Sequence, residues 1–100
     1  MSILVTGSTG TIGAQVLSYL QGRGVEVRAL TRSPDMAKLP SGVTPVRGDL
    51  AEVDSVRAAL DGVNTLFLLV PNVADELTQA MLTLTAAREA GVKGIVYLSV

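Results

Sequence analysis

Three regularly spaced glycines near the amino terminus are the first residues with a chemical use. Gly7, Gly10 and Gly13 lie in the segment GSTGTIG, which follows the apolar run 3–5 and Thr6. In nucleotide-binding folds the first such glycine permits a sharp turn and the second lets the backbone approach a phosphate. The third lets a helix pack closely against a strand. The spacing therefore predicts a loop that binds the pyrophosphate of a dinucleotide.

The helix expected after this loop supplies hydrogen-bond donors. The N–H groups of Thr11, Ile12 and Gly13 would point at the ligand, and the helix dipole favours its negative charge. The hydroxyls of Thr9 and Thr11 add donors, and Ser8 lies in the same loop. An ordinary structural turn is the alternative interpretation. The strand–loop–helix context favours nucleotide binding, and the absence of a following Gly-Lys-Ser/Thr excludes a P-loop.

An arginine follows the second expected strand, where NAD-dependent enzymes place an acid. Those enzymes bind the ribose 2′-OH with Asp or Glu about 20 residues after the glycines. Here the sequence reads Thr31, Arg32 and Ser33. The hydroxyls of Thr31 and Ser33 can add contacts, and Lys38 further on could approach as a second cation. A guanidinium can hold a 2′-phosphate through two hydrogen bonds, whereas a carboxylate would repel it. The pattern favours NADP(H) over NAD(H), with a solvated Arg32 as the alternative.

Two more segments are expected to contact the nucleotide. Asp49 and Leu50 follow the third strand, where the carboxylate would accept from the adenine amino group and the leucine would pack on the ring. Asp49 as the cap of the next helix is the alternative. Leu69, Val70 and Pro71 end the fourth strand beside the point where strand order reverses, which is where ligands bind in such sheets. Plain core packing is the alternative for Leu69 and Val70, and the two interpretations can hold together.

Apolar runs alternate with helical patterns along the chain, which predicts an α/β fold with a doubly wound parallel sheet. We expect a Rossmann fold with strand order 3-2-1-4-5 in three α/β/α layers. Segment 33–40 is expected to form at most a short helix and a loop. In the last helix, Leu77, Met81, Leu84 and Ala87 are the expected buried stripe. The expected strands are 2–6, 25–30, 43–47, 65–70 and 94–100, and the expected helices are 11–21, 52–60 and 74–90.

Composition narrows the function classes. The 100 residues carry a net charge of −1 with no basic stripe, which argues against a nucleic-acid partner. The chain has no cysteine and no histidine, so thiolate chemistry and the commonest general base are missing, and no metal site is expected. The longest apolar run, 66–70, is far shorter than the ~20 residues a membrane helix needs. We therefore expect a soluble, cytoplasmic protein without a membrane partner.

The sequence ends on the fifth expected strand. Doubly wound folds usually continue with another strand and helix on that side. We expect residues 1–100 to be one NAD(P)-binding domain, the N-terminal part of a longer protein. An unprotected edge on the fifth strand would also allow two copies to associate as a homo-oligomer.

The motifs together resemble one family, the NmrA-like type of atypical short-chain dehydrogenase/reductases. The resemblance is carried, in order, by TGSTGTIG at 6–13, VRALTRSP at 27–34, GDL at 48–50, and AAREAGVK leading to IVYLS between 86 and 99. It implies a three-layer Rossmann fold, NADP(H) in the groove and a substrate region further along. Members are similar to NADPH-dependent quinone or azo reductases, or to redox sensors that bind NADP(H).

The resemblance also implies roles for individual residues. It would place Gly7, Thr9, Gly10, Thr11 and Ile12 on the phosphates and ribose, Arg32 at the 2′-phosphate, Asp49 and Leu50 at adenine, residues 69–71 beside the ribose, and Ser99 near the nicotinamide. The classical branch adds a Tyr-x-x-x-Lys motif that these 100 residues do not contain, and Tyr97 does not replace it. No residue of the chain is assigned a catalytic role.

Three hypotheses about function follow. The first is an NADPH-dependent oxidoreductase that passes hydride to a small-molecule electron acceptor of quinone, azo or flavin type, with the cofactor supplying the chemistry. The second is a non-catalytic regulator that senses NADP(H). The third is a truncated Rossmann module with weak binding or none.

Overall fold

Five strands and three helices alternate along the chain in a computed structural model that describes residues 1–7, 10–35, 39–70 and 76–99. The strands are β1 (Ser2–Val5), β2 (Glu26–Thr31), β3 (Val43–Arg47), β4 (Thr65–Val70) and β5 (Gly94–Ser99). The helices are α1 (Thr11–Leu20), α2 (Val53–Ala59) and α3 (Glu76–Glu89).

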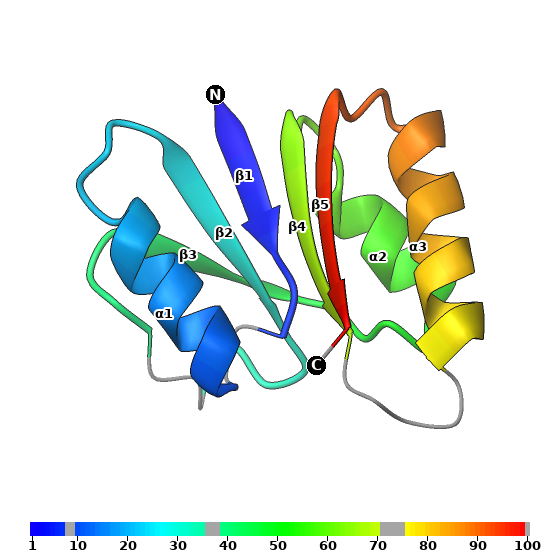
Figure 1. Cartoon of the computed structure of the whole chain (residues 1–100), viewed down its shortest axis with the longest axis horizontal. Coiled ribbons are helices and arrows are strands. Elements are labelled where there is room, and N and C mark those ends of the chain that lie inside the picture. Colours follow the sequence, from blue (N-terminus) through cyan, green and yellow to red (C-terminus); the bar gives the residue numbers. More distant parts are fainter. Residues whose placement is uncertain (8–9, 36–38, 71–75, 100) are drawn as a thin grey trace.

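All five strands pair in parallel in the order β3-β2-β1-β4-β5, which confirms the predicted topology. β1 lies at the centre, and its four residues are all buried, as a continuous apolar run predicts. Because every strand runs the same way, all the carboxyl ends lie at one edge of the sheet, where α1 also begins (Figure 1). The order of connection reverses between β1 and β4, so this pair marks the switch point of the sheet.

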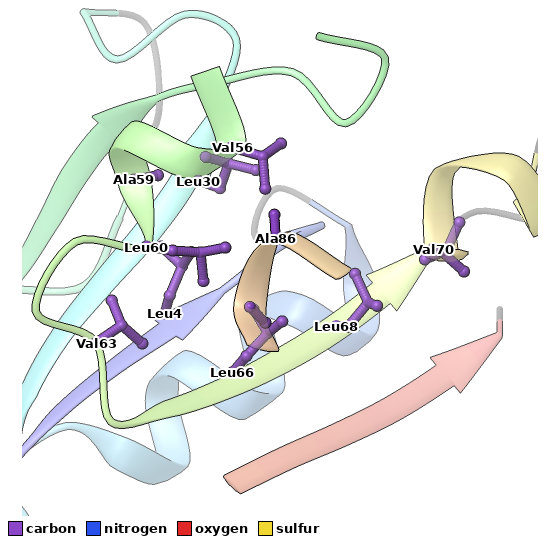
Figure 2. Close-up of a cluster of buried hydrophobic side chains, with 12 residues drawn as sticks. Leu4, Leu30, Val56, Ala59, Leu60, Val63, Leu66, Leu68, Val70 and Ala86 are labelled. Carbon is purple, nitrogen blue, oxygen red and sulfur yellow. The ribbon is translucent and has the colours of Figure 1, made fainter. Parts of the chain in front are cut away.

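Two separate cores cover the two faces of the sheet and confirm the three layers. Side chains alternate along each strand, so neighbouring residues contribute to opposite faces. The α2/α3-side core, drawn in Figure 2, includes Leu4, Leu30, Val56, Leu60, Leu66, Leu68 and Ala86. The α1-side core includes Ile3, Val5, Leu17, Leu20, Val27, Ala29 and Leu69.

The predicted buried stripe of α3 is wrong at two of its four positions. Leu77 and Met81 are 74% and 60% exposed, although Leu84 is half-buried and Ala87 is buried. The face that packs inward instead carries small side chains, namely Ala80, Thr83, Ala86 and Ala87. Apolar residues occur around the whole circumference of α3, so periodicity alone could not select the face that packs.

Smaller differences concern the element ends. α1 stops at Leu20, one residue before its predicted end. β2 continues through Thr31, one residue further than predicted. The described parts of segment 33–40, namely 33–35 and 39–40, contain no helix. Among the described helices, none combines the length and apolar character needed to cross a bilayer.

A buried hydroxyl in α3 yields a stability prediction. Thr83 is 1% exposed, and its Oγ1 has no hydrogen-bond partner among the described residues. Because an unpaired buried hydroxyl is costly, we expect Thr83→Val to raise the free energy of unfolding by about 1 kcal/mol in urea titrations. Thr85→Val is the control, since Thr85 is exposed and its hydroxyl donates to the Met81 carbonyl. A loss of stability in Thr83→Val would contradict the assignment.

Candidate functional site at the carboxyl edge of the sheet

The turn after β1 depends on a glycine pressed against β4. Gly7 has a φ of +63°, a conformation that L side chains rarely adopt. A Cβ added there would lie 3.1 Å from both the Cβ and the carbonyl oxygen of Leu69. The Gly10 N–H then donates to the Gly7 carbonyl at 3.1 Å, which closes the turn before α1. Gly7 is therefore required both for the backbone angle and for the close approach to β4.

The amino terminus of α1 opens at this edge without a side-chain cap among the described residues. Gly10 is the N-cap residue in an extended conformation, and no side chain hydrogen-bonds there. Among the described residues, a Cβ on Gly10 would meet only the Gly7 carbonyl oxygen, at an ordinary 3.5 Å. Gly13 is buried, whereas Thr11 and Ile12 are exposed. The first N–H groups of a helix lack partners within it, so this end suits an anion.

Thr6 ties this loop to the adjacent strand. Its hydroxyl donates to the Leu69 carbonyl at 2.9 Å and accepts from the Leu69 N–H at 2.8 Å. Its own N–H donates to the Phe67 carbonyl at 3.0 Å. The Thr6 side chain is fully buried. It thereby continues the pairing of β1 with β4 beyond the last residue of β1.

The end of β2 carries the predicted cation in an exposed bend. Arg32 is exposed, directly after the buried Thr31. The Thr31 hydroxyl accepts from the Ser33 N–H at 3.2 Å, and its carbonyl accepts from the Gly48 N–H at 2.9 Å. These contacts hold the ends of β2 and β3 together. They leave the Arg32 side chain at the surface of the edge.

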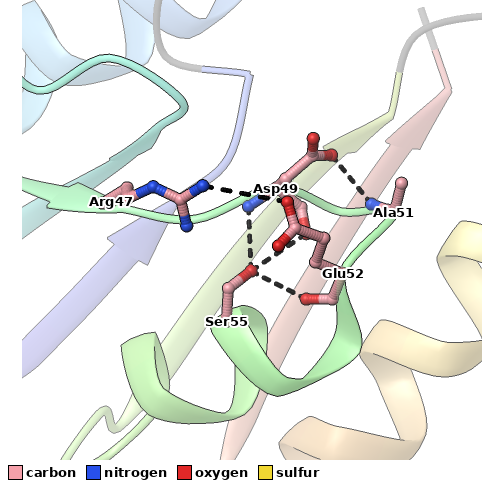
Figure 3. A network of polar contacts seen from close by, with 5 residues as sticks. All are labelled: Arg47, Asp49, Ala51, Glu52 and Ser55. Atoms are coloured by element: carbon pink, nitrogen blue, oxygen red, sulfur yellow. Dashed lines mark hydrogen bonds and ion pairs between the residues drawn. The ribbon is translucent and has the colours of Figure 1, made fainter.

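The loop between β3 and α2 is held by hydrogen bonds within it (Figure 3). The Asp49 carboxylate accepts from the Ala51 N–H at 2.9 Å, and the Asp49 N–H donates to the Ser55 hydroxyl at 3.0 Å. The Ser55 hydroxyl in turn lies 2.7 Å from the Glu52 carbonyl oxygen, to which it donates. Glu52, not Asp49, is the N-cap residue of α2. The capping alternative for Asp49 is therefore wrong, and its carboxylate stabilises a turn instead.

The remaining predicted residues fall into three groups. Leu69 and Val70 are buried in the cores, as the packing interpretation predicted. Leu50 is half-buried against the α2/α3-side core. Val70 pairs with Ser99 at the end of β5. Ser8, Thr9, Lys38 and Pro71 lie outside the described residues.

Sequence reasoning assigned no role to Thr6 or Ser55, although both organise the edge. The available signal for Thr6 was a hydroxyl residue that ends a wholly apolar strand directly before a glycine. For Ser55 it was a serine near the start of a helix, where hydroxyls often bind backbone groups. Among the described residues, no group of His, Asp or Glu side chains is arranged to hold a metal ion.

Comparison with known proteins places this arrangement in a family. The sequence matches the NmrA-like family over residues 1–100. This chain belongs to the NmrA-like family. It is 41% identical over 96 residues to an NAD(P)H azoreductase from Xenophilus azovorans, an alignment that covers 94% of this chain and 34% of that protein.

Two solved structures resemble this NmrA-like chain closely. An NADPH-dependent quinone oxidoreductase from Escherichia coli, complexed with NADPH, has a TM-score of 0.84 and 32% identity, covering 95% of this chain and 35% of that one. A triphenylmethane reductase from Citrobacter sp., complexed with NADP(H), has a TM-score of 0.83 and 32% identity, covering 97% and 36%. The chain thus spans about a third of the length of these relatives.

The Thr6 contacts of this NmrA-like chain lead to a stability prediction. Thr6→Val keeps the shape of the side chain but leaves the N–H and the carbonyl of Leu69 unpaired in a buried place. We expect the free energy of unfolding to fall by about 2–4 kcal/mol, the penalty for two unsatisfied groups. Thr6→Ser, which keeps the hydroxyl, is the control and should cost less than ~1.5 kcal/mol. In urea titrations, a loss in Thr6→Ser that equals or exceeds the loss in Thr6→Val would contradict the assignment, because Thr6→Ser keeps the hydroxyl and removes only the methyl group.

Proposed function

We propose that this chain is the cofactor-binding part of an NADPH-dependent oxidoreductase. The observation that carries the proposal is the glycine turn at the switch point, where α1 begins at the carboxyl edge and no described side chain caps its amino terminus. Relatives named as NAD(P)H-dependent reductases, about three times as long, support it. Their length also supports assigning residues 1–100 to the cofactor domain of a longer protein.

The pyrophosphate is assigned to the turn from Gly7 to Gly13. Backbone N–H groups at the start of α1 provide donors fixed by the helix, and the helix dipole favours the negative charge. Gly10 has no side chain, and a Cβ placed there would meet, within the described part of the chain, only the Gly7 carbonyl oxygen. A phosphate could therefore approach the main chain closely. The residues present thus fit the phosphate part of a dinucleotide.

The adenosine half is assigned to the ends of β2 and β3. Arg32 would hold the 2′-phosphate, because it is exposed and stands where an acid would select NAD(H). The Asp49 Oδ1 already accepts from Ala51, so contact with the adenine amino group is left to its second oxygen. Leu50, half-buried beneath this loop, would give the ring an apolar contact.

The reduced nicotinamide would supply the chemistry by giving a hydride, two electrons with one proton, to an acceptor that takes a further proton from solvent. Acceptors of quinone or azo type fit the names of the relatives, and a flavin-type acceptor is proposed on the same chemistry alone. This chain's contribution is to bind and orient the cofactor at the edge formed by β1, β4 and β5.

Filling the space at Gly10 tests the phosphate site. We expect Gly10→Val to lower the affinity for both NADPH and NADH at least ~10-fold in calorimetric titrations, because a branched side chain would exclude the phosphate. Gly10→Ala should have a smaller effect. Unfolding curves control for folding, and the ordinary 3.5 Å approach of a Cβ to the Gly7 carbonyl indicates that both variants fold. Unchanged affinity in a folded Gly10→Val protein would remove this loop from the site.

The choice of cofactor tests Arg32. We expect Arg32→Ala to weaken NADPH binding by about 1.5–3 kcal/mol, the range for hydrogen bonds to charged groups, and to leave NADH binding nearly unchanged. Added salt should narrow the difference between the cofactors in the native protein. Arg23→Ala is the matched control, since Arg23 stacks on Tyr19 at the other end of α1. Equal losses for both cofactors would indicate general damage to the pocket.

A further inference from the structure

A second arginine stands at the same edge as Arg32 and has a weak partner. Arg47 is the last residue of β3, and its side chain is 60% exposed. Its guanidinium lies 3.8 Å from a carboxylate oxygen of Glu52, whose side chain is 56% exposed (Figure 3). An exposed pair at this distance gains little from its mutual attraction. The guanidinium is therefore free to exchange this partner for a stronger anion.

The register of the sheet brings Arg47 next to the end of β2. Arg47 is aligned with Thr31 across the β2–β3 pair, so the two side chains leave the same face of the sheet. The Thr31 carbonyl also accepts from the Gly48 N–H at 2.9 Å, which holds the two strand ends together. Because Arg32 directly follows Thr31, the two arginines stand on adjacent strand ends.

We propose that Arg47 is a second cation for the 2′-phosphate of NADP(H), and that the phosphate displaces Glu52 from it. The proposal rests on the proposed function, because it deepens the assignment of Arg32. A phosphate monoester carries up to two negative charges and three acceptor oxygens, so it can accept from two guanidinium groups at once. The Glu52 carboxylate, by comparison, offers Arg47 a single negative charge in an ion pair that is exposed to solvent.

The carboxylates nearby determine how strongly this edge selects the phosphate. Asp49 lies on the same loop, and its Oδ1 is engaged by the Ala51 N–H. Glu52 caps α2 only through its backbone, with no side-chain hydrogen bond at the cap. Removing the Glu52 charge should therefore release Arg47 without disturbing α2. Glu52 acts as an internal competitor that lowers the affinity for NADP(H) and leaves NAD(H) unaffected.

The test is a double-mutant cycle on the full chain, with NADPH and NADH affinities measured by calorimetry at fixed salt. Glu52→Gln should tighten NADPH binding about two- to fivefold, and Arg47→Ala should weaken it about fivefold, with NADH binding unchanged in both. In Arg47→Ala, adding Glu52→Gln should have no further effect. Glu89→Gln is the matched control, because it makes the same charge change and breaks the exposed Arg57–Glu89 pair shortly before β5 begins.

Each outcome bears on one proposal. If Arg32→Ala lowers the NADPH/NADH affinity ratio but Arg47→Ala does not, the role of Arg47 is wrong while that of Arg32 stands. If neither variant changes the ratio, the 2′-phosphate site itself is wrong. A Glu52→Gln gain that persists in Arg47→Ala would show direct repulsion of the phosphate and overturn the competition. Equal losses of NADPH and NADH in Arg47→Ala would assign the guanidinium to the adenine ring instead.

Discussion

The whole edge depends on the contact between Thr6 and Leu69. β1 and β4 are the strands at which the direction of winding changes, so the chain leaves them toward opposite faces of the sheet. Hydrogen bonds between strands would normally stop where β1 ends. The Thr6 hydroxyl instead exchanges a pair of hydrogen bonds with the Leu69 backbone, as another strand residue would. Gly7 can then turn against Leu69 with no side chain of its own, and this fixes where α1 begins.

The same arrangement recurs at the other strand ends. At the end of β2 the Thr31 hydroxyl binds the Ser33 N–H, and between β3 and α2 the Ser55 hydroxyl accepts from the Asp49 N–H. Short hydroxyl side chains thus satisfy the backbone groups that loops leave unpaired. Because these contacts form within the protein, the described ends of β1, β2 and β3 are held in place without a ligand.

The sequence was sufficient for the sheet because its signals are strong and local. Continuous apolar runs mark buried parallel strands, and right-handed crossovers then leave few possible strand orders. The face of α3 could not be predicted, because Leu77 and Met81 are as apolar as the residues that pack. Which face of α3 packs depends on how closely the helix can approach β4. The small side chains of Ala80 and Ala87 permit a close approach on one side, and the periodicity of the sequence does not reveal this tertiary property.

In the candidate site too, residues that act locally could be predicted from the sequence, whereas residues that act through tertiary contacts could not. Gly7, Gly10 and Arg32 could be proposed from the sequence because each would act through its own backbone angle, missing side chain or charge. The carboxylate of Asp49 was ambiguous, since a turn, a helix cap and a ligand all use the same oxygen atoms. Thr6 and Arg47 could not be assigned at all, because their partners, Leu69 and Glu52, become neighbours only through the fold. Hydroxyls that act locally hold the ends of the strands, whereas Arg32 and Arg47 have no strong partner among the described residues and are exposed at the surface.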